Sequence, residues 1–137
     1  MLLRELFDKS VPYEWTSQDH EHWYAEFNIG DISYEFVANI LNPYPEDDEE
    51  VEVEIEFFHR TPGGQPTFKV SGVGNQHVLF TTIIEIIRDM ITNLKPDGII
   101  YSAAEPNRAK LYERMLARLL PNAKKYVSGN KVYVSLN

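Results

Sequence analysis

The hydrophobic residues of this chain repeat with two different periods, and this change of period constrains the fold more than any other feature. Between residues 22 and 57, apolar and polar residues alternate, which predicts strands with one buried face. Between residues 76 and 94, apolar residues recur every three or four positions, which predicts a long helix. Strands followed by helices pack most simply as a sheet with the helices on its faces. We therefore expect an α/β (α+β) fold with a mixed, mostly antiparallel sheet.

Turn signals divide the chain into further elements. We expect strands at 23–29, 32–40, 51–57 and 67–70, a helix at 76–94, a strand at 98–102, a helix at 106–119 and a hairpin at 124–127 and 131–136. This order, β-β-β-β-α-β-α-β-β, begins as an antiparallel meander and predicts a right-handed crossover between parallel strands around the long helix. A short first helix is expected around Leu2, Leu3, Leu6 and Phe7, and residues 11–20 are expected to be a loop. No repeat or linker divides residues 1–137, so we expect one domain.

Length and composition narrow the class of protein. A chain of 137 residues is about one domain long, and it contains no cysteine, which excludes disulfides and cysteine-based metal sites. Its charged N-terminus does not resemble a signal peptide, and its apolar runs are too short to cross a bilayer. We expect a soluble, cytoplasmic protein.

The chain is strongly acidic, with a formal net charge of −8. Such a field repels nucleic acid and anionic membranes, so neither is expected as a partner. The acidity serves either solubility or attraction to a basic protein partner, including one that normally binds DNA. Five consecutive acidic residues at 46–50 are expected to form a solvated loop.

Two segments around the long helix carry candidate chemistry. Ser71-Gly72-Val73-Gly74-Asn75-Gln76 lies before that helix, where glycines allow close backbone approach and the helix N-terminus offers free N–H groups to a phosphate. The same glycines would also serve a sharp turn. In the later helix, Tyr112 lies two turns after Glu105 on the same side, so its hydroxyl is a candidate general acid for a departing thiolate. A tyrosine at the edge of the core would show the same pattern.

Other ionisable residues give weaker signals. Glu54 and Glu56 are candidate general bases for an amine, or simply the wet face of a strand. His20 and His22 lie beside two acidic residues, but no third ligand follows at suitable spacing, so no metal site is expected.

The glycine-bearing loop, the long helix, the next strand and a helix containing Leu-Tyr together resemble the acetyl-CoA-binding half of the GNAT family of N-acetyltransferases. The topology is similar over residues 22–136, and the motifs over residues 71–112. The family's motifs are matched at Gly72, Gly74, Leu111 and Tyr112. They are not matched at four other positions. Ser71 stands in place of a basic residue, Gln76 and Arg108 each stand in place of a small residue, and Glu105 stands in place of an asparagine. Residues 101–112 are also similar to a stretch found in bacteriophage open reading frames.

This resemblance implies a divergent, phage-type GNAT-like protein that uses acetyl-CoA. By position, it assigns the cofactor to Gly72, Val73, Gly74, Asn75, Gln76, His77, Glu105 and Arg108, and catalysis to Tyr112 and Glu56. The first function that we expect is acetyl transfer to the amine of a small molecule or a protein. The alternative is a non-catalytic acidic protein on the same scaffold that binds a host or virion protein.

Overall fold

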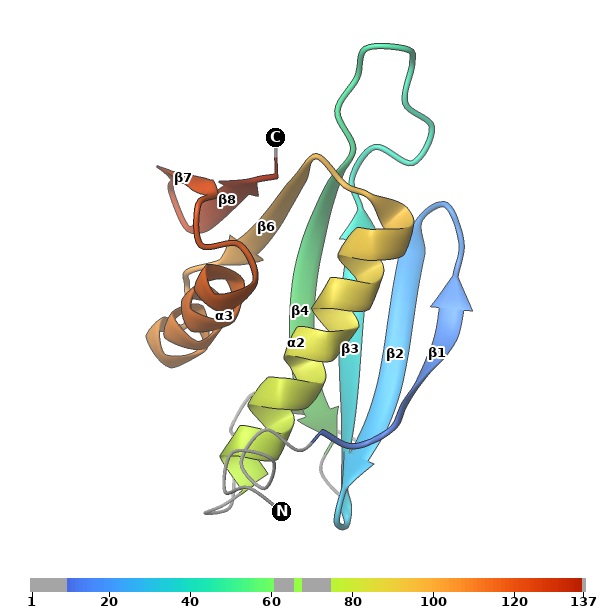
Figure 1. Ribbon diagram of the computed structural model, residues 1–137, viewed down its shortest axis with the longest axis vertical. Helices are drawn as coiled ribbons and strands as arrows, with labels where there is room; N and C mark the ends of the chain where they lie inside the picture. The colour runs from blue at the N-terminus through green and yellow to red at the C-terminus, as the bar shows by residue number, and fades with distance from the viewer. Residues whose placement is uncertain (1–9, 61–65, 68–74, 137) are drawn as a thin grey trace.

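The computed structural model describes residues 10–60, 66–67 and 75–136, and it contains a single sheet with two helices (Figure 1). The strands are β1 (Tyr13–Gln18), β2 (His22–Ile29), β3 (Ile32–Ile40), β4 (Glu52–Arg60), β5 (Pro66–Thr67), β6 (Gly98–Ser102), β7 (Lys124–Ser128) and β8 (Lys131–Ser135). The helices are α2 (Asn75–Leu94) and α3 (Pro106–Leu119). In the described part of the chain, no helix is long and apolar enough to cross a membrane.

The sheet is mixed and mostly antiparallel, as predicted. Its strand order is β1-β2-β3-β4-β6-β8-β7, and β5 pairs with the end of β4. Among the strands that the structure describes, only β4 and β6 run parallel to each other. Gly30 and Gly129 adopt φ values of 60° and 59° in the two tight hairpin turns, a conformation that glycine reaches without strain.

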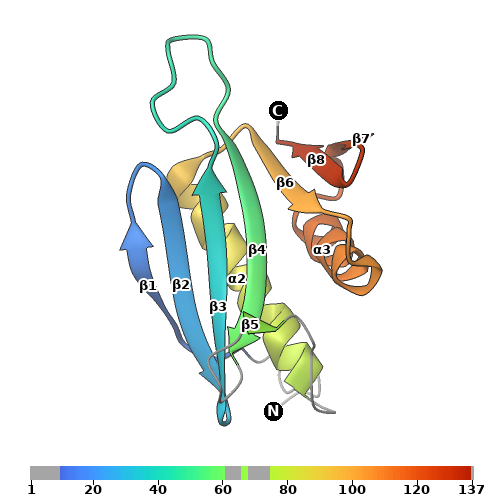
Figure 2. The same ribbon diagram turned by 180° about the vertical axis from the view of Figure 1, so that it is seen from behind.

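The core lies between α2 and one face of the sheet (Figures 1 and 2). Val53, Ile55 and Phe57 of β4 are buried there, while the glutamates between them lie on the opposite face, as the alternation predicted. The buried side of α2 is rich in isoleucine, which packs well against a pleated surface. Helix α3 adds Tyr112, Met115 and Leu116 to the same core and contacts both α2 and β6.

The two helices and the terminal hairpin lie close to their predicted ranges, but the N-terminal region differs from the prediction. The segment 11–20, expected to be a loop, contains β1. Its inward residues Tyr13 and Trp15 donate hydrogen bonds to the carboxylate of Asp89 on α2, at 3.1 and 2.8 Å. Only these two aromatics alternate with polar residues in β1, which is too short a pattern to predict a strand from the sequence. The expected first helix lies outside the described residues.

Of the expected strand at 67–70, only Thr67 is described, and it belongs to β5, which pairs antiparallel with β4. Residues 68–70 lie outside the described residues. The strand that pairs in parallel with β6 is β4. The element order has one more strand at its start than predicted, because β1 precedes the expected meander.

Candidate functional site

The parallel strands β4 and β6 separate after a short pairing. Their register is Glu52 with Gly98, Val53 with Ile99 and Glu54 with Ile100, and β4 then continues to Arg60 without β6 beside it. Figure 1 shows the two strands diverging toward the carboxyl end of β4. A pocket of about 280 Å³ opens at this divergence. It is lined by Glu54, Ile55, Glu56, Ser102, Arg108, Tyr112 and Lys131, and we call it the splay pocket.

Tyr112 closes the inner end of the splay pocket. It projects from α3, is 2% exposed, and packs its ring against Phe57 and Tyr101 at centroid distances of 5.5 and 5.4 Å. Its hydroxyl oxygen accepts a hydrogen bond from the backbone N–H of Phe57 at 3.1 Å. This amide lies beyond the last residue of β4 that pairs with β6, so a side chain replaces the missing strand as its partner.

The environment of Tyr112 keeps its phenol protonated. Burial raises the pKa of Tyr112 to about 12, and hydrogen bonds from Phe57 and Arg108 offset only part of that effect. Both of these neighbours are donors, so neither uses the phenolic proton. A group placed in the pocket can therefore receive a hydrogen bond from Tyr112.

Two ion pairs border the splay pocket. The guanidinium of Arg108 lies 3.5 Å from the carboxylate of Glu56, and the ammonium of Lys131 contacts Glu54. The side chain of Arg108 is 13% exposed and that of Glu56 is 47% exposed, so the carboxylate is the partner that solvent reaches. The two cations thus balance the two glutamates at the pocket.

The structure brings together three residues that the sequence assigned to different roles: Tyr112, Glu56 and Arg108. Glu105 is the N-cap residue of α3, is exposed, and makes no capping hydrogen bond with its side chain. Residues 75–77 form the first turn of α2, where His77 is exposed. Gly72, Val73 and Gly74 lie outside the described residues.

The sequence did not identify Ser102 and Lys131 as lining residues. Lys131 pairs with Ser102 between β8 and β6, and this neighbourhood depends on the order β4-β6-β8. A strand order of this kind joins residues far apart in the chain, and no local signal in the sequence marked it.

The two histidines near β2 make protein contacts. A ring nitrogen of His22, Nδ1, lies 3.1 Å from the side-chain oxygen of Asn39, and the His20 ring packs against Tyr44. No three metal-ligating side chains cluster suitably for a metal within the ranges that the structure describes.

A scan against protein-family models, a search of curated proteins and a search of solved structures each found no match. The functional argument therefore depends on the geometry of the splay pocket and of the surrounding surface.

Proposed function

We propose that this protein is a GNAT-like acyltransferase that transfers the acetyl group of acetyl-CoA to an amine. The observation that carries the proposal is the splay pocket, with a protonated tyrosine at its inner end. The gap between the diverging parallel strands suits an extended thioester arm, which would lie along the short stretch of β4 between its last pairing with β6, at Glu54, and its pairing with β5, at His59.

The start of α2 supports an anion at one end of such an arm. Helix geometry leaves the N–H groups of its first turn without partners inside the helix, and this turn contains no acidic residue. In both ribbon views the first turn of α2 lies near the carboxyl end of β4 (Figures 1 and 2). A diphosphate held there would direct its arm toward the divergence of β4 and β6.

In the proposed reaction, the amine nitrogen attacks the thioester carbonyl carbon and the carbon–sulfur bond breaks, releasing a thiolate. Tyr112 would stabilise that thiolate as a hydrogen-bond donor. Full proton transfer is disfavoured, because a phenol with a pKa of about 12 is a weaker acid than a thiol with a pKa of about 8.5, a difference worth roughly 5 kcal/mol. The thiolate would then take its proton from solvent.

Glu56 is the proposed acceptor for the proton that the attacking amine loses. Its carboxylate is partly solvent-exposed at the pocket, so a single water can relay the proton. The contact with Arg108, at 3.5 Å, is at the outer limit of hydrogen bonding and is therefore weak enough to exchange.

Calorimetry with acetyl-CoA, followed by an assay of thiol release with primary amines, tests this function. We expect wild-type protein to bind acetyl-CoA, and Tyr112→Phe to bind it but release thiol about 100-fold more slowly, the usual contribution of one such donor. Tyr101→Phe is the matched control, because it removes a neighbouring buried hydroxyl outside the pocket lining. Absence of binding at millimolar acetyl-CoA, in protein that is folded, contradicts the proposal.

A further inference from the structure

The splay pocket has one wall that the proposed chemistry leaves unused. The thioester arm would lie along β4, which forms the opposite wall. The unused wall consists of Ser102, the last residue of β6, and Lys131, the first residue of β8. These two residues are directly paired across the strands, so their side chains lie side by side on one face of the sheet. This wall is therefore available to the second substrate, the acceptor.

Both residues of this wall keep hydrogen-bond donors for a ligand. The hydroxyl oxygen of Ser102 accepts a hydrogen bond from the backbone N–H of Ala104 at 3.2 Å, and no described residue accepts the hydroxyl proton. The ammonium of Lys131 has three donors, of which Glu54 accepts one. The Lys131 side chain is 53% exposed, so it can turn toward a bound group. A hydroxyl beside an ammonium is a suitable donor pair for a carboxylate.

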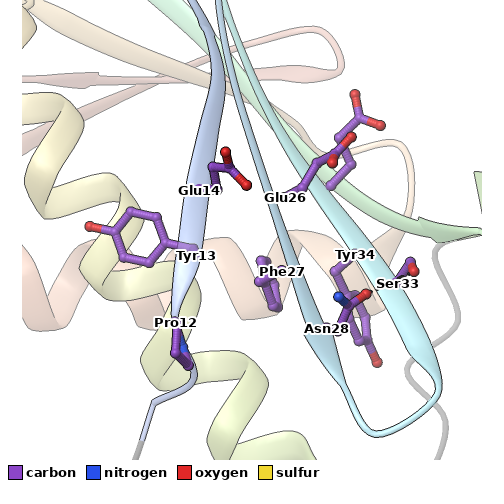
Figure 3. A pocket seen from close by; sticks show the side chains of 9 residues that line it. Pro12, Tyr13, Glu14, Glu26, Phe27, Asn28, Ser33 and Tyr34 are labelled. Atoms are coloured by element: carbon purple, nitrogen blue, oxygen red, sulfur yellow. Dashed lines mark hydrogen bonds between the residues drawn. The ribbon is translucent and has the colours of Figure 1, made fainter.

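The charges of the splay pocket also have a definite pattern. Its charged lining residues are two glutamates and two cations. A larger hollow, of about 520 Å³, lies at β1, β2 and β3 and is drawn in Figure 3, where Glu14 and Glu26 are labelled. Every charged residue that lines this hollow is a glutamate. The hollow therefore offers no cation to an anionic group, whereas the splay pocket can pair with a group of either sign.

We infer that the acceptor in the splay pocket is a small α-amino acid, an inference that rests on the proposed function. Its carboxylate binds Lys131 and Ser102, and its amine lies toward Glu56. A zwitterion brings one charge of each sign to a pocket that holds two of each. A phosphate would instead place up to two negative charges beside the glutamates. The volume of about 280 Å³ is small for a ligand site, which favours a short side chain.

The reaction then yields an N-acetyl amino acid and free coenzyme A. The ammonium of the amino acid first loses one proton to solvent. Its nitrogen attacks the thioester carbonyl carbon, so that a carbon–nitrogen bond forms and the carbon–sulfur bond breaks. The second proton of the nitrogen passes through water to Glu56, and the thiolate takes a proton from solvent. Lys131 and Ser102 take no part in these transfers, and they hold the carboxylate.

Thiol release from acetyl-CoA, with L-alanine and L-alaninamide as acceptors, tests the inference. The amide lacks the carboxylate, which otherwise stabilises the ammonium form, so its amine is the more readily deprotonated of the two. A preference for alanine must therefore come from recognition of the carboxylate. We expect kcat/KM to be at least about fivefold higher for alanine, the upper range for one solvent-accessible ion pair. Equal values, or a preference for the amide, would overturn the inference while acetyl transfer itself would stand.

Variants of Lys131 locate the source of this preference. We expect Lys131→Gln to lower the preference about fivefold, and Lys131→Arg, which keeps the charge, to lower it less than twofold. Lys125→Gln is the matched control, because it removes a lysine of β7 that pairs with Glu113 outside the pocket. An equal loss in Lys125→Gln would reduce the effect to net charge and overturn the inference. Failure of the proposed function is a different result, because wild-type protein would then bind no acetyl-CoA.

Discussion

The backbone N–H of Phe57 donates a hydrogen bond to the hydroxyl of Tyr112 across 3.1 Å, which ties α3 to β4 where β4 has left β6. A sheet edge that opens inside a core leaves amides that must find other partners. Here the partner is a side chain whose own proton stays available to a ligand. One residue thus holds the divergent strands in place and supplies the proposed donor.

Tyr112→Phe should destabilise the fold even without any ligand. The ring would still pack against Phe57 and Tyr101, but the buried amide of Phe57 would lose its partner, at a cost of about 1–3 kcal/mol. Urea denaturation measures this loss. Tyr126→Phe is the control, because the Tyr126 side chain is largely exposed and its loss should be nearly neutral. Equal stability of the two variants would mean that the Phe57 amide finds another partner.

Stability should fall steeply in alkaline solution. The pKa of Tyr112 is about 12 in the folded protein against 10 in the unfolded chain, so the folded state holds this proton more tightly. The resulting stability, up to about 3 kcal/mol, is fully present below pH 10 and is lost as the pH rises to about 12. Denaturation midpoints between pH 8 and 12 test this. The difference in stability between wild type and Tyr112→Phe should narrow above pH 10. A constant gap would contradict it.

Asp89→Ala should loosen β1 specifically. The carboxylate of Asp89 accepts hydrogen bonds from the Tyr13 hydroxyl and the Trp15 indole, and hydrogen bonds to charged groups contribute about 1.5–3 kcal/mol each. We expect faster hydrogen exchange at the β1 amides, with exchange in β3 and β4 little changed. Arg88→Ala, an exposed position on the same helix, is the control. Uniformly faster exchange would show that β1 is an integral part of the cooperative core.

The sequence predicted the elements whose signals are local. The long helix was expected over 76–94 and occupies Asn75–Leu94, because one apolar stripe runs its whole length. Strand β1 was missed because its inward aromatics, Tyr13 and Trp15, lie among polar residues and just after Pro12. Tertiary contacts with Asp89 stabilise this strand, and such contacts produce no periodic pattern of hydrophobic residues in the sequence.

The same distinction applies to the candidate site: residues with a local chemical signal were predicted, and residues brought there by the strand order were not. Tyr112 and Glu56 were chosen for their chemistry, and the structure places both at the splay pocket. Lys131 was not chosen, since its place beside Glu54 depends on β8 lying next to β6. The alignment of Glu14, Glu26 and Glu35 on adjacent strands could not be predicted either, because the register of three strands creates it.

Glu105→Asn should both stabilise α3 and, on the proposed function, strengthen cofactor binding. Glu105 is the N-cap but makes no capping hydrogen bond, whereas asparagine is among the best N-cap residues, so a gain of about 0.5–1 kcal/mol is expected. The change also removes a carboxylate close to an anionic ligand. Thermal unfolding measures the first effect, and calorimetry with acetyl-CoA the second. Glu105→Gln is the control, since it removes the charge without creating a good cap. Greater stability with unchanged affinity for acetyl-CoA would refute the assignment of Glu105 to the cofactor, but not the rest of the proposed function.

Glu26→Gln should make the protein more stable. Glu14 and Glu35 lie directly opposite Glu26 on the two neighbouring strands, and relief of the repulsion between these carboxylates is expected to contribute about 0.5–1 kcal/mol. Thermal unfolding measures the gain, and it should shrink in high salt, which screens the repulsion. Asp48→Asn controls for the change in net charge and should alter stability little. Reduced stability of Glu26→Gln would show that the Glu26 carboxylate has a favourable partner in solution.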